Sequence, residues 1–211
     1  MSKIKAIIFD MDGVLIEAKE WHYEALNRAL ALFGMEISRY DHLVTYDGLP
    51  TKTKLKMLSM ERGLPEALHP FINEMKQVYT MEMIYSKCKP TFYHQFALSR
   101  LHANGYRMAV CSNSIRNTVA LMLERADLLP LLDFFLSNED VSKPKPAPDM
   151  YIEAIRRMGL TASECLIVED NPNGIKAARE SGAHVLCVND VRDVNHSNIV
   201  QYITELESEH A

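Results

Sequence analysis

Two aspartates, one residue apart, follow a short apolar run near the start of the chain. Asp10 and Asp12 come directly after Ala6–Phe9 and are followed by Gly13. The run predicts a strand covered on both faces, whose carboxyl end delivers its residues to a ligand-binding crevice. There Asp10 could attack a substrate, Asp12 could serve as acid and then base, and Gly13 could leave backbone amides uncovered for an anion. An ordinary Asp-Gly turn is the alternative.

A second acidic pair, Glu169 and Asp170, ends another apolar run. Carboxylates gathered in one crevice repel each other, by about 4 kcal/mol for a pair at ~4 Å and an effective dielectric of about 20. A hard divalent cation removes this repulsion, and Mg²⁺ suits a site that also binds phosphate. We therefore predict Mg²⁺ bound by the carboxylates of Asp10 and Asp170, with Glu169 bound directly or through water. A structural Glu-Asp pair is the alternative, which the adjoining apolar run disfavours.

Groups able to bind a phosphate lie between the two acidic pairs in the chain. Ser112 follows the apolar run 107–111, and Ser114 is suited to cap the next helix, where amides and a hydroxyl form an anion site. A plain helix cap has the same pattern. Lys143 and Lys145 alternate with prolines that keep the segment extended. One of these lysines could neutralise the charge on a nucleophile and a transferring group, or both could be solvated.

The elements that must position these residues alternate between strand and helix from residue 90 onward. Apolar runs predict strands at 107–111, 134–136, 165–168 and 184–188, and periodic segments predict helices at 92–104, 114–125, 149–158 and 174–181. This alternation indicates the α/β class, with a doubly wound, Rossmann-like parallel sheet. Because crossovers are right-handed, the carboxyl ends of the strands should meet at one edge.

Residues 16–89 have a different character and contain no pattern typical of a strand. Apolar residues at helical spacing predict three helices, the first ending at Gly34 and the second beginning after Thr51. We predict that 16–89 form an inserted all-helical cap domain. Residues 1–15 and 90–211 would then form the α/β core domain that carries the catalytic site.

Composition narrows the possible partners and location. The chain of 211 residues carries a net charge of −5, which argues against nucleic acid or an anionic membrane as a partner. No apolar stretch approaches the ~20 residues of a membrane span. The four cysteines have no C-x-x-C spacing and three lie in apolar runs, which indicates a reducing, cytoplasmic location. We expect a monomer or weak dimer that acts on a small molecule.

Four segments together resemble, in order, the four motifs of the haloacid dehalogenase superfamily. They span residues 10–14, 112–114, 145–149 and 168–174. The resemblance implies that Asp10 is the nucleophile and Asp12 the acid and base. It also implies that Ser112 and Lys145 hold the phosphate, and that the Asp12 carbonyl joins Asp10 and Asp170 around Mg²⁺. Asn113, within the second motif, is expected to contact the substrate.

The helical insertion resembles the cap of the branch that holds β-phosphoglucomutase-like proteins and phosphoglycolate-type phosphatases. Residues 46–52 resemble its substrate-specificity loop, with Thr51 and Lys52 where phosphomutases usually carry an arginine. His22 lies where many relatives have a histidine facing the site, so these three residues are expected to contact substrate. Lys76 is either a further contact or a solvated side chain.

These features predict a Mg²⁺-dependent phosphatase that hydrolyses a small phosphorylated metabolite, such as a sugar phosphate, through an aspartyl phosphate. A phosphomutase, which passes the phosphoryl group to a sugar hydroxyl, is the nearest alternative. A phospho-accepting receiver domain would be shorter and lack the insertion, and a dehalogenase proper would need no Mg²⁺. A non-catalytic phospho-ligand binding protein is disfavoured by the complete set of polar groups.

Overall fold

The computed structural model describes residues 3–208, which divide into two compact units. The first unit takes the chain up to Glu17 and from Lys89 onward. The second unit is Ala18–Cys88. The acidic pairs and both candidate lysines belong to the first unit.

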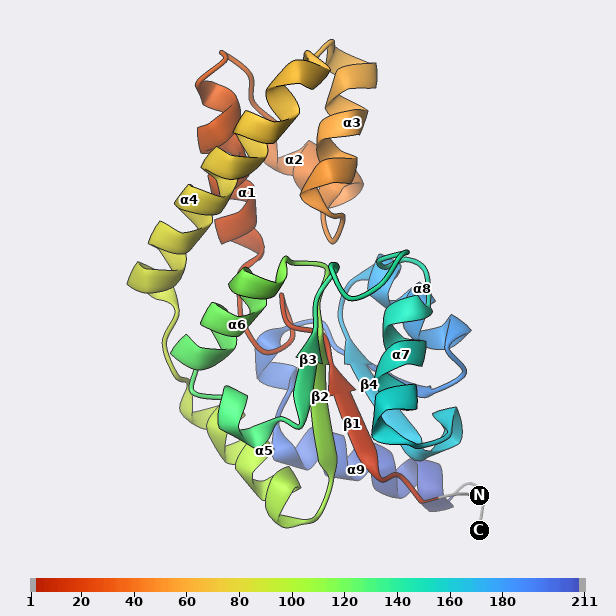
Figure 1. Cartoon of the computed structure of the whole chain (residues 1–211). Helices are drawn as coiled ribbons and strands as arrows, with labels where there is room; N and C mark the ends of the chain where they lie inside the picture. The colour runs from red at the N-terminus through yellow and green to blue at the C-terminus, as the bar shows by residue number, and fades with distance from the viewer. Residues whose placement is uncertain (1–2, 209–211) are drawn as a thin grey trace. The chain divides into compact units, whose positions relative to one another are not determined.

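The first unit is built on a sheet of five strands among the described residues. They are β1 (Ala6–Phe9), β2 (Arg107–Cys111), β3 (Phe134–Leu136), β4 (Cys165–Glu169) and β5 (His184–Cys187). Every neighbouring pair is parallel and the order is β3-β2-β1-β4-β5, with β1 in the centre (Figure 1). The predicted doubly wound parallel sheet is therefore confirmed, and its topological switch point lies where β1 and β4 meet.

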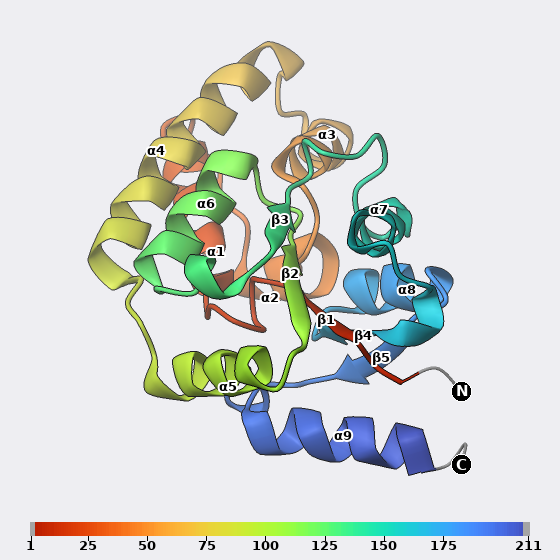
Figure 2. The same ribbon diagram turned by 60° about the horizontal axis from the view of Figure 1, so that its bottom comes forward.

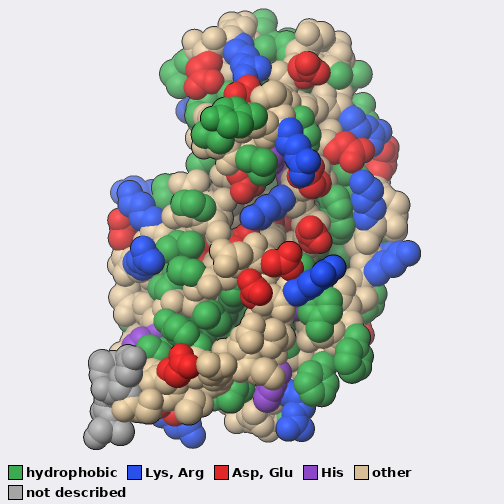
Figure 3. Space-filling model, turned by 180° about the vertical axis from the view of Figure 1, so that it is seen from behind, with side chains coloured by type: hydrophobic (Ala, Val, Ile, Leu, Met, Phe, Trp, Pro, Cys, Tyr) green, Lys and Arg blue, Asp and Glu red, His purple; other side chains and the backbone are tan. Residues whose placement is uncertain are grey.

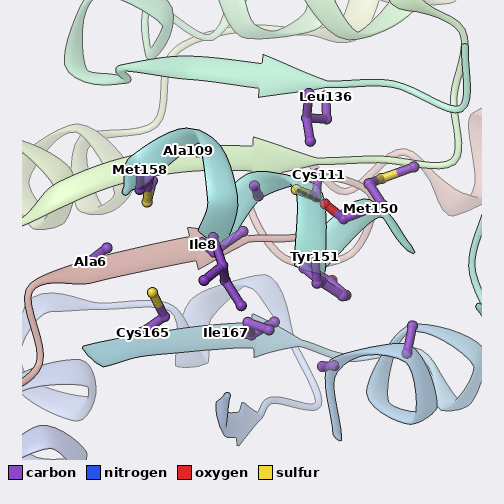
Figure 4. Packing of buried hydrophobic residues seen from close by; sticks show 14 residues of the cluster. Ala6, Ile8, Ala109, Cys111, Leu136, Met150, Tyr151, Met158, Cys165 and Ile167 are labelled. Carbon is purple, nitrogen blue, oxygen red and sulfur yellow. Dashed lines mark hydrogen bonds between the residues drawn. The ribbon is translucent and has the colours of Figure 1, made fainter. Parts of the chain in front are cut away.

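Helices cover both faces of this sheet (Figure 2). One face carries α5 (Phe92–Ala103), α6 (Arg116–Arg125) and α9 (His196–Ser208), and the other carries α7 (Asp149–Met158) and α8 (Pro172–Glu180). Strand residues alternate between the faces, so Ile8, Ala109 and Ile167 point toward α7 and α8, where Met150 and Tyr151 fill the interior (Figure 4). Burial on both faces explains why these strands are continuously apolar.

Two local features differ from the sequence-based expectations. The helix α6 begins at Arg116 with Ile115 as its N-cap, and the Glu139 carboxylate accepts from the Arg116 amide at 2.6 Å, so the prediction that Ser114 caps this helix is wrong. The Ser114 hydroxyl instead donates to Asp12. Cys187 lies at the end of the edge strand β5 and is exposed, whereas Cys88, Cys111 and Cys165 are buried.

The second unit is helical, and residues 18–88 contain no strand. Its elements are α1 (Lys19–Ala31), α2 (Arg39–Asp41), the π-helical turn η1 (His42–Tyr46), α3 (Thr51–Arg62), the 3₁₀ turn η2 (Glu66–Leu68) and α4 (His69–Lys87). Leu26, Leu30 and Ile72 belong to its buried core. The Asn27 side chain also fixes the chain after α1, because it both accepts from the Ile37 amide and donates to the Ile37 carbonyl at 2.8 Å.

The face of the protein in Figure 3 carries charges of both signs and no large patch of one sign. Basic and acidic side chains are interspersed there, which is consistent with the modest net charge of −5. Within residues 3–208, no helix combines the length and the apolar character needed to cross a membrane.

Candidate active site

Asp10 lies at the switch point of the sheet. It directly follows β1, and its backbone N–H donates to the carbonyl of Val168 in β4 at 3.0 Å. This bond continues the pairing of β1 with β4 by one residue beyond the strand. The carboxylate is therefore held at the carboxyl edge of the sheet, where the apolar run predicts it.

The lysine that reaches Asp10 is Lys145. Its ammonium group donates to Asp10 Oδ1 at 2.6 Å, to Glu169 Oε1 at 2.8 Å and to the carbonyl of Cys111 at 2.8 Å. The side chain is 3% exposed, whereas Lys143 is exposed. The structure thus resolves which of the two lysines of the proline-rich segment lies beside the aspartate.

Burial and charge shift the titration of this pair. Burial lowers the pKa of Lys145, but the carboxylates of Asp10 and Glu169 outweigh it and raise its pKa overall, so the lysine stays charged. Burial also raises the pKa of Asp10 well above its usual range; Lys145 opposes this, and the nearby carboxylates of Glu169 and Asp170 add to it. The site therefore holds more negative charge than one lysine balances.

Glu169 is the most heavily bonded of these carboxylates. Its Oε1 accepts from Lys145 and from the Tyr151 hydroxyl at 2.8 Å, and its Oε2 accepts from the amides of Asp170 and Asn171 at 2.9 and 3.1 Å. The start of α8 lies against it so closely that a Cβ on Gly174 would come within 1.6 Å of Oε1. Burial raises the pKa of Tyr151 well above its usual range, so Tyr151 remains a donor.

Three carboxylates form a group that could hold a cation. One oxygen each of Asp10, Glu169 and Asp170 lie within 4.8 Å of one another. Hard oxygen donors of this kind match Mg²⁺, which binds few protein ligands and keeps several waters. The residues present therefore fit the predicted metal, and Asp10 and Asp170 are two of its predicted ligands.

The turn after β1 positions Asp12 and uses Gly13 for its shape. Gly13 has a φ of 95°, which glycine adopts readily. Its N–H donates to the carbonyl of Ile16 at 2.8 Å, so the amide of Gly13 itself is not among the backbone amides left for an anion. Asp12 Oδ2 accepts from the Ser114 hydroxyl at 3.2 Å, which ties the turn to the segment after β2.

That segment carries the predicted phosphate-binding residues. Ser112 is buried, and its Oγ accepts from the amide of Ser114 at 3.1 Å. Asn113 uses both ends of its side-chain amide on the backbone of Lys145, with Nδ2 donating to the carbonyl and Oδ1 accepting from the amide, each at 3.0 Å. The structure thus brings Ser112 and Asn113 close to the segment that presents Lys145.

The remaining predicted site residues belong to the second unit. His22 lies on α1, and its Nδ1 is 3.3 Å from the Nζ of Lys76, which is buried on α4. Thr51 begins α3 and is half-buried, and Lys52 follows it and is exposed. Contact of His22, Thr51 and Lys52 with substrate stays a prediction.

Two supporting contacts in the site were not predicted from the sequence. Tyr151 bonds to Glu169, and its ring lies 4.6 Å from the Nζ of Lys145. Ser114 bonds to Asp12 rather than to a helix end. A signal for Tyr151 was present, because a tyrosine on the apolar face of a helix needs a partner for its hydroxyl. Nothing in the spacing identifies that partner.

Fold and site together define an α/β enzyme with a buried aspartate and lysine at the switch point of a parallel sheet. A family model described as haloacid dehalogenase-like hydrolase matches residues 7–188, and the chain belongs to this family. The protein CbbY of Rhodobacter capsulatus is 29% identical over 87% of this chain and 85% of its own. The phosphorylated carbohydrates phosphatase of Thermotoga maritima is 25% identical over 85% of this chain and 82% of its own.

A solved structure with the same fold is the β-phosphoglucomutase of Clostridium difficile. It superposes with a TM-score of 0.82 and covers 97% of this chain and 99% of its own, at 18% identity. At that identity the likeness shows the fold alone. The predicted superfamily, the hydrolase class and the α/β architecture are confirmed by these matches.

Proposed function

We propose that this hydrolase is a Mg²⁺-dependent phosphatase that transfers the phosphoryl group of a small metabolite to Asp10 and then to water. The observation that carries the proposal is the position of Asp10. Its buried carboxylate contacts the Lys145 ammonium at 2.6 Å and lies within one cluster with Glu169 and Asp170. The proposed nucleophile, a fixed positive charge and a candidate metal site thus lie together at the carboxyl edge of the sheet.

The metal would be held by the carboxylates of Asp10 and Asp170 and by the Asp12 carbonyl. Each oxygen of Glu169 already accepts two hydrogen bonds, which fills the capacity of a carboxylate. We therefore propose that Glu169 holds Lys145 in place and does not bind the metal directly. When bound, Mg²⁺ neutralises the excess negative charge and polarises a phosphoryl oxygen.

The first chemical step belongs to Asp10 and Asp12. An Asp10 oxygen attacks phosphorus in line, the bond from phosphorus to the leaving oxygen breaks, and Asp12 protonates that oxygen. Lys145 keeps its charge throughout and stabilises the negative charge of the transferring group. The hydroxyl of Ser112 accepts from the Ser114 amide and carries a proton that it could donate to a phosphoryl oxygen.

The second step regenerates the enzyme. Asp12 is now a carboxylate and takes a proton from water as the water attacks the aspartyl phosphate. Phosphate leaves and Asp10 is restored. The bond from Ser114 to Asp12 Oδ2 keeps this carboxylate at the edge of the site between the two steps.

The substrate class rests on the relatives. A curated relative acts, by its name, on phosphorylated carbohydrates. We therefore propose a sugar phosphate or a similarly small phosphorylated metabolite.

The experiment is phosphate release from p-nitrophenyl phosphate and from a panel of phosphorylated metabolites, with Mg²⁺ and with a chelator. The proposal expects turnover that the chelator abolishes and that added Mg²⁺ restores. Turnover that survives complete chelation, or no turnover on any substrate, would overturn it. Isomerisation of a hexose 1-phosphate with a bisphosphate primer, without phosphate release, would identify a phosphomutase instead.

A further inference from the structure

Residues at the end of β2 hold Lys145 at both of its ends. The ammonium group donates to the carbonyl of Cys111 at 2.8 Å. Two residues along, the side chain of Asn113 pairs with the backbone of Lys145 through two hydrogen bonds of 3.0 Å. A side-chain amide that donates and accepts in this way fixes a peptide unit in both position and orientation.

The Asn113 backbone is itself anchored to the loop after β3. Its carbonyl accepts from the Asn138 side chain at 2.8 Å, and the Asn138 amide donates to the Ser114 carbonyl at 3.2 Å. The loops that follow β2 and β3 are therefore joined around Asn113. Since β2 pairs directly with β1, this connection places Lys145 relative to Asp10.

We propose that Asn113 is a positioning residue for Lys145, an inference that rests on the proposed function. Asn113 fixes the backbone from which the lysine side chain reaches its partners. Those partners are three oxygens within 2.8 Å, so a small shift of the backbone would break several contacts together. Misplacement of about 1 Å can lower a rate by about 10²-fold.

The chain contains a matched control for this pairing. Asn27, in the second unit, makes the same two bonds to the backbone of Ile37, each at 2.8 Å. The substitution Asn113→Asp keeps the acceptor for the Lys145 amide and places a carboxylate against its carbonyl. Asn27→Asp has the same chemical effect on Ile37, in the other unit.

The test has two readouts on the full-length protein. Native acetylation with acetic anhydride, followed by tandem mass spectrometry, gives the ratio of Lys145 to Lys143 modification; Lys145 is buried and Lys143 exposed. Steady-state kinetics with p-nitrophenyl phosphate and Mg²⁺ gives kcat and KM. Thermal unfolding of each variant sets a temperature at which all are folded.

In Asn113→Asp we expect the acetylation ratio to rise about tenfold as the local structure opens. We also expect kcat to fall about tenfold, with KM changed by less than about threefold. Asn27→Asp should leave the ratio and kcat close to wild type. Asn113→Ala removes both bonds without adding charge and gives the same test if Asn113→Asp does not fold.

The inference is overturned if the ratio is unchanged in the Asn113 variants, or if Asn27→Asp raises it equally. A raised ratio with unchanged kcat would also overturn it. If wild type does not hydrolyse phosphate esters, the proposed function fails, while acetylation still decides whether Asn113 holds Lys145 in place.

Discussion

Asp10 and Asp12 have different surroundings, which fit the different roles that we propose for them. Asp10 is buried against a lysine, which suits a nucleophile that must be fixed in place. Asp12 is half-buried and bonded to one serine hydroxyl, which suits a group that exchanges protons with a leaving group and with water. The same residue type can thus perform two tasks because its environment differs.

This division of roles predicts the behaviour of Asp12→Asn. With p-nitrophenyl phosphate the leaving group needs little protonation, so the first step should proceed while the second stalls. We expect a burst of about one nitrophenol per enzyme molecule, followed by a steady rate lowered about 10²-fold or more. Stopped-flow absorbance measures both phases. A lowered steady rate with no burst of nitrophenol would contradict the role of Asp12 in the second step.

At the scale of elements, the start of α8 must come very close to Glu169. Gly174 is the residue that permits this approach, because a Cβ there would lie 1.6 Å from Glu169 Oε1. The carboxylate that supports Lys145 is thus confined between β4 and α8. A shift of α8 would therefore also move Glu169 and disturb its hydrogen bond with Lys145.

Gly174→Ala should consequently harm stability and activity together. We expect the free energy of unfolding to fall by about 2 kcal/mol, as for other overpacked buried sites. We expect kcat to fall at least about tenfold because Lys145 loses its alignment. Denaturant unfolding and phosphate release measure the two effects. Lys176→Ala, on the exposed side of the same helix, is the control, and equal behaviour of the two variants would contradict this account.

The turn η1 carries a buried histidine, His42, whose ring nitrogens have no hydrogen-bond partner among the described residues. Burial lowers its pKa to about 4; Lys54 and His22 add to this, whereas Asp47 and Glu20 oppose it. In the unfolded chain the pKa of a histidine is about 6.5. Because the unfolded state then binds the proton more readily, stability is lost as pH falls from about 6.5 to about 4.

The substitution His42→Phe should remove this pH dependence. The variant keeps an aromatic ring beside Tyr23, which lies 4.9 Å from the His42 ring. Urea unfolding of both proteins between pH 7 and pH 4.5 should show that wild type loses more stability than the variant on acidification. If both proteins lost the same free energy of unfolding on acidification, His42 would not contribute to the pH dependence of stability.

The strands and their ends could be predicted because apolar runs that stop at charged residues are a local signal. Asp10 and Asp170 were predicted in this way to follow strands, and the strands were predicted to within a residue. Two contacts, that of Tyr151 with Glu169 and that of Ser114 with Asp12, depend on how distant segments meet. Spacing in the sequence holds no information on those contacts. The helix α9 also lies beyond the last element predicted.

At the scale of the whole molecule, Mg²⁺ binding should raise the thermal stability of the folded protein. A ligand present at about ten times its Kd stabilises the folded state by about 1.4 kcal/mol. For a chain of this length that raises Tm by about 4 °C. Mg²⁺ should produce this shift in wild type and not in Asp170→Asn, with NaCl at equal ionic strength as the control. A shift retained by Asp170→Asn would place the metal elsewhere.

The central claim is that phosphorus is passed to Asp10, and Asp10→Asn tests it most directly. The amide still accepts a bond from Lys145, so the fold and Tm should be retained, whereas kcat for phosphate release with Mg²⁺ should fall at least about 10³-fold. Intact-mass analysis must show that the asparagine has not deamidated. A folded, undeamidated Asp10→Asn protein that retains wild-type turnover would contradict the account.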